Sequence, residues 1–199
     1  QEAGYEVLVF HATGSGGQAM ESLISDGLIA GVLDITTTEL ADELVGGILS
    51  AGKDRLTAAA IKGVPQVVSL GALDMVNFGP LDTVPERYRE RDLYVHNPTI
   101  TLMRTTPGEC AELGRIIAAK LNQATGPVAL FLPLRGVSMI DAEGMPFWSP
   151  EADAALFDAI RTTVDGARVE LVELDLHVND PAFADAMADR LLAMLAANA

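Results

Sequence analysis

The chain has 199 residues, of which 49% are hydrophobic, and it carries a formal net charge of −15. This length favours one domain with a substantial core over two small ones. The net charge argues against anionic partners, namely a nucleic-acid backbone or an anionic membrane surface. A single cysteine excludes an intramolecular disulfide framework, and no apolar run approaches the roughly 20 residues that span a bilayer. We therefore expect a cytoplasmic protein.

The N-terminal stretch predicts a strand, a glycine loop and a helix, in that order. The apolar run Val7–Phe10 precedes the loop, and apolar residues with helical spacing follow it. Such an arrangement points free backbone N–H groups and a helix dipole at an anion. We predict that a small-molecule anion binds at the loop residues Thr13, Gly14, Ser15, Gly16 and Gly17. The alternative is a tight turn that needs glycine for its backbone geometry and binds nothing.

The same loop also matches the dinucleotide-binding pattern G-x-G-x-x-G/A, with Asp34 at the spacing of a ribose-binding acid. A lone match of this kind is common. Asp34 is followed by the three hydroxyls of Thr36, Thr37 and Thr38, so it could orient these side chains or cap a helix instead. Further on, Lys53 and Arg55 are interpreted as the solvated start of a helix.

The rest of the chain alternates strands with helices. Strands are predicted at Gly31–Ile35, Gln66–Leu70, Val128–Leu132 and Val169–Leu174. Helices are predicted to begin near Thr37, Leu56, Thr106, Ser149 and Asn179, with possible capping boxes at Thr36–Glu39 and Thr106–Glu109. Residues 71–99 are predicted to form a long irregular loop. The alternation predicts an α/β fold for a single Rossmann-like domain, residues 1–199, whose parallel sheet has helices on both faces in three α/β/α layers.

Ligands of such sheets bind outside the carboxyl ends of the strands. The polar residues expected there include Asp34, Asp74, Asn77, Asn97, Arg135, Ser138, Asp141 and all three histidines, His11, His96 and His177. We assign acid–base chemistry to His96 and Asp74, and ligand binding to Asn77, Asn97 and Arg135. The alternatives are a hydrogen-bonded loop histidine for His96, and structural salt bridges for Arg104 and Arg135. Cys110 is expected to pack in the core.

Four runs of residues together resemble a known family: His11–Gly17, Gly31–Glu39, Ser69–Gly79 and His96–Thr105. They look like the tomato mosaic virus resistance protein-like family, whose members typically have two α/β halves. The chain is similar to the second half, so the resemblance implies a missing N-terminal half as a partner. It also implies a cytoplasmic homo-oligomer with a nucleotide bound in one half or between the two. We expect ATP or another phosphorylated ligand, together with Mg²⁺ if the ligand is a nucleotide.

Three functional hypotheses follow. The first is a small-molecule enzyme or nucleotide-binding domain that holds a phosphate at the glycine loop. The second is a noncatalytic half that serves assembly, which the mean hydropathy of +0.27 supports because it indicates a sizeable interface. The third is a metal-dependent hydrolase built on His11, His96 and His177, although their spacing matches no metal-binding motif.

Overall fold

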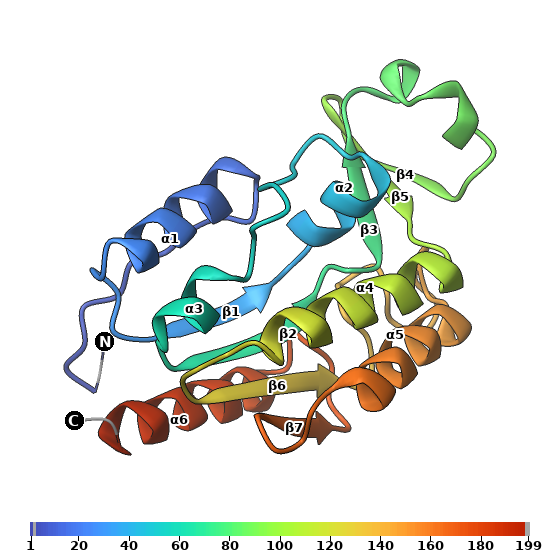
Figure 1. The fold of residues 1–199 in the computed structure, drawn as a ribbon. Coiled ribbons are helices and arrows are strands. Elements are labelled where there is room, and N and C mark those ends of the chain that lie inside the picture. The colour runs from blue at the N-terminus through green and yellow to red at the C-terminus, as the bar shows by residue number, and fades with distance from the viewer. Residues whose placement is uncertain (2, 198–199) are drawn as a thin grey trace.

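The main sheet of the protein has four parallel strands. The computed structural model describes residues 1 and 3–197. The strands lie in the order β1 (Val32–Thr36), β2 (Gln66–Gly71), β6 (Val128–Pro133) and β7 (Val169–Leu174) (Figure 1). Helices cover both faces of this sheet, so the predicted three-layer α/β fold is confirmed, and the four parallel strands are close to their predicted positions.

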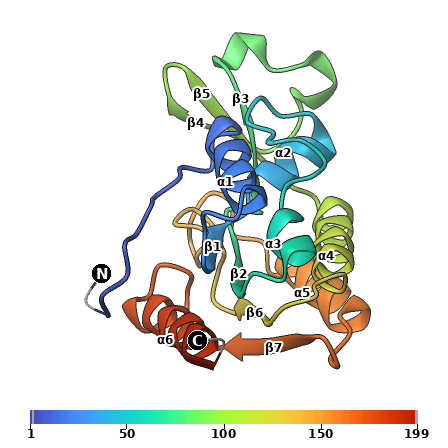
Figure 2. The same ribbon diagram turned by 60° about the vertical axis from the view of Figure 1, so that its left-hand side comes forward.

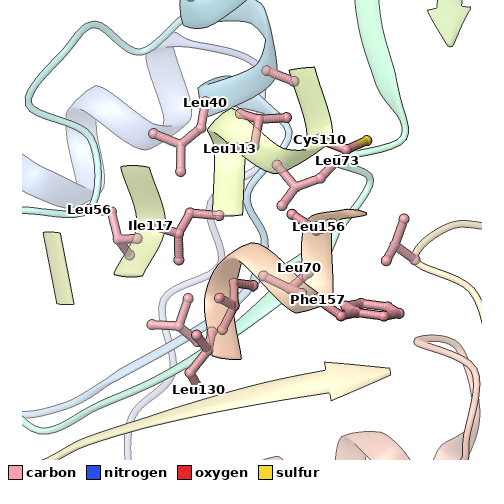
Figure 3. Packing of buried hydrophobic residues seen from close by; sticks show 14 of the residues in the cluster. Leu40, Leu56, Leu70, Leu73, Cys110, Leu113, Ile117, Leu130, Leu156 and Phe157 are labelled. Carbon is pink, nitrogen blue, oxygen red and sulfur yellow. The ribbon is translucent and has the colours of Figure 1, made fainter. Parts of the chain in front are cut away.

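The two central strands are buried on both faces, and alternate side chains contact different helices. Val68, Leu70 and Leu130 pack against α4 (Pro107–Leu121) and α5 (Pro150–Thr163), as Figure 3 shows for part of this cluster. Val67, Ala129 and Phe131 face the opposite way and pack against α6 (Pro181–Ala197). Continuous apolar strands of this kind are typical of parallel sheets buried on both faces. Cys110 lies in the first cluster, so its predicted core position is confirmed.

Three shorter helices lie near β1. They are α1 (Ser15–Ser25), α2 (Glu39–Val45) and α3 (Ala58–Lys62). The predicted capping box at Thr36–Glu39 is wrong: Thr38 is the N-cap, without a side-chain cap, because the Glu39 carboxylate is engaged elsewhere. The capping box at Thr106–Glu109 is confirmed in full, with both reciprocal hydrogen bonds present.

Residues 71–99 are not the irregular loop that we predicted. They contain β3 (Met75–Phe78), the 3-10 helices η1 (Leu81–Thr83) and η2 (Glu86–Tyr88), and β4 (Leu93–Asn97). With β5 (Ile100–Arg104) these strands form a second, antiparallel sheet in the order β3-β5-β4. Their pairing was missed because each strand is short and prolines punctuate the segment, so the ladder depends on tertiary contacts rather than on local pattern.

The first predicted strand also differs from the structure. Val7–Phe10 lies beside α1 in Figure 2, outside the sheet, and forms no ladder in this arrangement. Val7, Leu8 and Val9 are 47%, 54% and 78% exposed. β1 is therefore an edge strand, and a groove separates it from this apolar segment.

Candidate functional site

The glycine loop is folded around a carboxylate of the protein itself. The amides of Gly14 and Gly17 both donate to Oε1 of Glu39, at 2.7 and 3.1 Å. The Glu39 side chain is fully buried. A Cβ at Gly17 would lie 2.2 Å from Oε2 of this residue, and Gly14 has a φ of +83°. Both positions therefore require glycine for structural reasons. Gly17 leaves room for the Glu39 carboxylate, and Gly14 adopts a left-handed backbone conformation.

A buried arginine neutralises that carboxylate. Arg55 donates from Nε to Oε2 of Glu39 at 2.6 Å, and from its two terminal nitrogens to both oxygens of Asp34, at 2.5 and 2.7 Å. Burial opposes the charge of this guanidinium, yet the attraction of Asp34 and Glu39 raises the pKa of Arg55 above its ordinary value. Our interpretation of Arg55 as a solvated residue is therefore wrong, because its side chain is only 2% exposed. Both oxygens of Asp34 are engaged by Arg55, so its local role is an ion pair and neither the orientation of threonine hydroxyls nor the helix cap that we considered.

Glu21 completes this group on the outer side. Its carboxylate accepts hydrogen bonds from the amides of Leu56 and Ala58, and it lies 3.5 Å from Arg55. Glu21, Asp34, Glu39 and Arg55 are called the Arg55 cluster below. The cluster ties α1, β1, α2 and the start of α3 together. It also places three carboxylates around one guanidinium immediately beneath the glycine loop.

Part of the loop remains open for a ligand. Ser15 is exposed and Gly16 is partly exposed, and no residue in the described part of the chain accepts a hydrogen bond from either amide. A Cβ at Gly16 would lie 1.9 Å from the carbonyl oxygen of His11, so this glycine is required by close packing. Thr13 is exposed beside them. The anion site itself stays a prediction, now centred on Thr13, Ser15 and Gly16, because Glu39 occupies the amides of Gly14 and Gly17.

The three threonines after β1 take different positions. Thr37 is buried and donates from its hydroxyl to the carbonyl oxygen of Ser69 at 3.0 Å, and Thr38 donates to that of Met75 at 3.4 Å. These two bonds fasten the end of β1 to its neighbours. Only Thr36 is exposed, and it lines the groove beside β1, which has a volume of about 1460 Å³.

A second polar cluster lies beyond the carboxyl ends of β2 and β6. The fully buried Asp74 accepts a 2.7 Å hydrogen bond from the Ser138 hydroxyl through Oδ2, while its Oδ1 has no partner among the described residues. Burial raises the pKa of Asp74 to about 6. His177 approaches the same loop, with Nε2 2.9 Å from the carbonyl oxygen of Ser138. The predicted convergence of Asp74 and Ser138 at this edge is therefore present.

Arg104 joins two further carboxyl groups to this cluster. Its Nη2 lies 3.2 Å from Oδ1 of Asp141 and 2.8 Å from Oδ1 of Asp153. Burial, and then the charge of Asp153, raise the pKa of Asp141 above its ordinary value. Both aspartates line a smaller cleft of about 570 Å³. Arg104 thus forms the structural salt bridges that we considered as the alternative to anion binding.

Other predicted site residues lie outside both clusters. His96 and Asn97 are exposed on β4, where the Asn97 side chain closes the turn to Thr99. Arg135 is exposed and paired with Asp175. Asn77 is buried and donates twice to Asp42, a residue that the sequence did not single out.

The three histidines are also not assembled into a metal site. Within residues 1 and 3–197, no group of three or more histidine, cysteine or acidic residues could hold a metal ion. The sequence did not reveal the central role of Glu39 and Arg55 because they are 16 residues apart, with Glu39 on α2 and Arg55 in the turn before α3. No local signal singled out Glu39, because α2 also carries the acids Asp42 and Glu43.

Comparison with known proteins identifies the family. A family model described as "Uncharacterised protein family (UPF0261) C-terminal domain" matches residues 1–195. The chain belongs to this family. It is 58% identical over 192 residues to a UPF0261 protein of Clostridium tetani, an alignment that covers 96% of this chain and 48% of that protein. It is 57% identical over 186 residues to a UPF0261 protein of Rhizobium meliloti, with 93% of this chain and 47% of that protein covered.

A plant relative confirms the resemblance noted in the sequence. The ToMV resistance protein Tm-1(GCR237) of Solanum lycopersicum is 47% identical over 190 residues, covering 95% of this chain and 25% of the tomato protein. The chain spans about half the length of the bacterial relatives described above. In the part of the chain that the structure describes, no helix is both long and apolar enough to cross a membrane.

Proposed function

We propose that this domain binds a phosphorylated small molecule at the first turn of α1, with ATP as the leading candidate. The observation that carries the proposal is the pair of amides at Ser15 and Gly16, for which the described residues supply no acceptor. Both lie at an exposed helix start, where the helix dipole favours negative charge. The exposed hydroxyl of Ser15 adds a further donor to a phosphate in this position, while that of Thr13 donates to the carbonyl oxygen of His11 at 3.4 Å.

The charge around the loop favours a nucleotide that arrives with Mg²⁺. The Arg55 cluster has three carboxylates and one guanidinium, and its Glu39 contacts the amide of Gly17, next to Gly16. This excess of negative charge lies within a Debye length of the loop and repels a bare phosphate. A magnesium complex carries less negative charge, so it is repelled less. Nucleotide binding is also what the family resemblance implies.

Ser15 offers a direct test because its side chain is exposed at the first position of the helix. Ser15→Asp places a carboxylate where the phosphate would bind, while an acid in the first turn of a helix is favourable for folding. Two unit charges about 4 Å apart near a protein surface repel by about 4 kcal/mol, so binding should weaken at least about 100-fold. Thermal stability should change little, because the favourable helix dipole is opposed by the negative charge of the Arg55 cluster.

The measurement is isothermal titration calorimetry with Mg·ATP, ATP in EDTA and inorganic phosphate. Ser22→Asp is the matched control, since it adds the same charge to an exposed position further along the same helix. We expect Mg·ATP to bind most tightly and the control to bind it like the wild type. Equal affinity in Ser15→Asp and wild type, or no heat with any of the three ligands, would overturn the proposal.

A further inference from the structure

We propose that Tyr5–Phe10 is a strap that closes onto the outer edge of β1 as a fifth parallel strand. The inference concerns the groove between them and is independent of the proposed ligand. Its volume of about 1460 Å³ exceeds the roughly 300–1,000 Å³ of ordinary small-molecule pockets. A groove of this size, between a free strand edge and an extended apolar segment, has room for an additional β-strand.

The groove lies between helices of the two outer layers and the edge of the sheet, which is where a further strand of a three-layer fold would lie. Met20 of α1 lines one side, and Leu191 and Leu195 of α6 line another, while Val32–Thr36 of β1 forms its edge. A strand placed there would be covered on both faces, like β2 and β6. Tyr5–Phe10 lines the remaining side, so the segment already lies at the mouth of the space that it would fill.

The backbone of β1 presents unpaired groups to this space. The Val32 amide donates to the carbonyl oxygen of Pro65, on the side of β2, at 2.9 Å. Successive N–H groups of a regular parallel strand point alternately to its two sides, so that of Leu33 points to the outer edge. Ile35 lies at a register irregularity between Asp34 and Thr36, where this alternation is interrupted. No strand in the described residues pairs with that edge. An open edge of this kind is a site for strand addition.

The sequence of the segment suits a buried parallel strand. Val7, Leu8, Val9 and Phe10 form a continuous apolar run, as do strands that are covered on both faces. The segment, α1 and β1 follow one another as strand, helix and strand, the connection that joins parallel neighbours. Closure would bury Val9, which is 78% exposed in the open arrangement.

The segment would move about a hinge at His11, directly after Phe10. A Cβ at Gly16 would meet the carbonyl oxygen of His11, so the end of the segment is packed against the first turn of α1. Residues before His11 can therefore move onto β1 while the glycine loop keeps its contacts with Glu39. Closing the strap changes the groove and leaves the Arg55 cluster intact.

Hydrogen exchange of the 199-residue chain tests the strap without any ligand. The variant is Val9→Asp, which costs nothing if this side chain stays exposed but is strongly unfavourable in a strand between two apolar layers. We expect the amide of Leu33 to exchange at least about tenfold faster in Val9→Asp than in wild type, with a lower melting temperature. Ala3→Asp is the control, because it adds the same charge at an exposed position just before the segment.

Two results would overturn the proposal. The first is equal exchange at Leu33, and equal melting temperature, in Val9→Asp, Ala3→Asp and wild type, which would mean that the segment remains open. The second is protection that grows with protein concentration, which would assign the edge of β1 to a second copy of the chain. Loss of nucleotide binding in Ser15→Asp bears on neither result, so the two proposals can fail separately.

Discussion

Replacing Arg55 with methionine should destabilise the protein strongly. The side chains of Arg55, Asp34 and Glu39 are 2%, 5% and 0% exposed, so the substitution leaves two buried carboxylates without their counter-ion. Methionine fills much of the volume of the arginine stem, so the loss is mainly electrostatic. Removing one partner of a buried ion pair costs about 3–5 kcal/mol, against a total stability of about 5–15 kcal/mol for a typical domain. At about 2–4 °C per kcal/mol, the melting temperature should fall by about 6–20 °C.

The assay is equilibrium unfolding in urea at pH 7, followed by the fluorescence of the single tryptophan, Trp148, and by far-ultraviolet circular dichroism. Arg115→Met is the matched control, because Arg115 forms an exposed pair with Glu112 whose side chains are 53% and 45% exposed. An exposed pair contributes about 0–1 kcal/mol, so this variant should unfold close to wild type.

A deficit below about 1 kcal/mol at pH 7, equal to that of Arg115→Met, would refute the idea that the Arg55 cluster holds this end of the fold together.

Two further predictions concern the glycine loop and the buried acids. Gly16→Ala should lower stability by about 1–3 kcal/mol, because the new Cβ would lie 1.9 Å from the carbonyl oxygen of His11. Gly108→Ala is the control and should stabilise slightly, because the nearest atom to its new Cβ is 3.9 Å away. Equal urea midpoints for the two variants would contradict this prediction. Burial raises the pKa of Asp42 and Asp74 to about 6 each, and that of Asp141 as well. A carboxyl group whose pKa is raised by folding stabilises at low pH, and the contribution is lost as the pH rises through the folded pKa. Stability should therefore fall between about pH 4 and 6, by about 2–3 kcal/mol for each of Asp42 and Asp74. The same pH series measured by urea unfolding in 0.5 M salt, where the Debye length lies between roughly 3 and 10 Å, should show the same loss of stability. If the loss disappears in salt, repulsion between surface charges causes it instead.

Much of the fold could be predicted from local sequence. Apolar runs located β2, β6 and β7, and turn and cap residues located α4 and α5, because these signals act over a few residues. The antiparallel sheet of β3, β4 and β5 could not be predicted in this way. Gly79-Pro80 and Pro85 lie in the connection between the short strands β3 and β4. Both strands pair with β5, which follows them in the sequence, so the order β3-β5-β4 depends on tertiary contacts.

The candidate site was predictable in its location and not in its pairings. The sequence by itself determined the strand–helix alternation, the family, and the gathering of polar residues such as Asp74 and Ser138 at the carboxyl edge, because hydrophobic period and topology fix which ends of the strands meet. Only the tertiary structure decided that Glu39 binds the glycine loop and that Arg55 is its buried counter-ion. The physical reason is that a carboxylate can accept from any donor within reach. Which donors those are depends on how α1, α2 and the segment before α3 pack around β1.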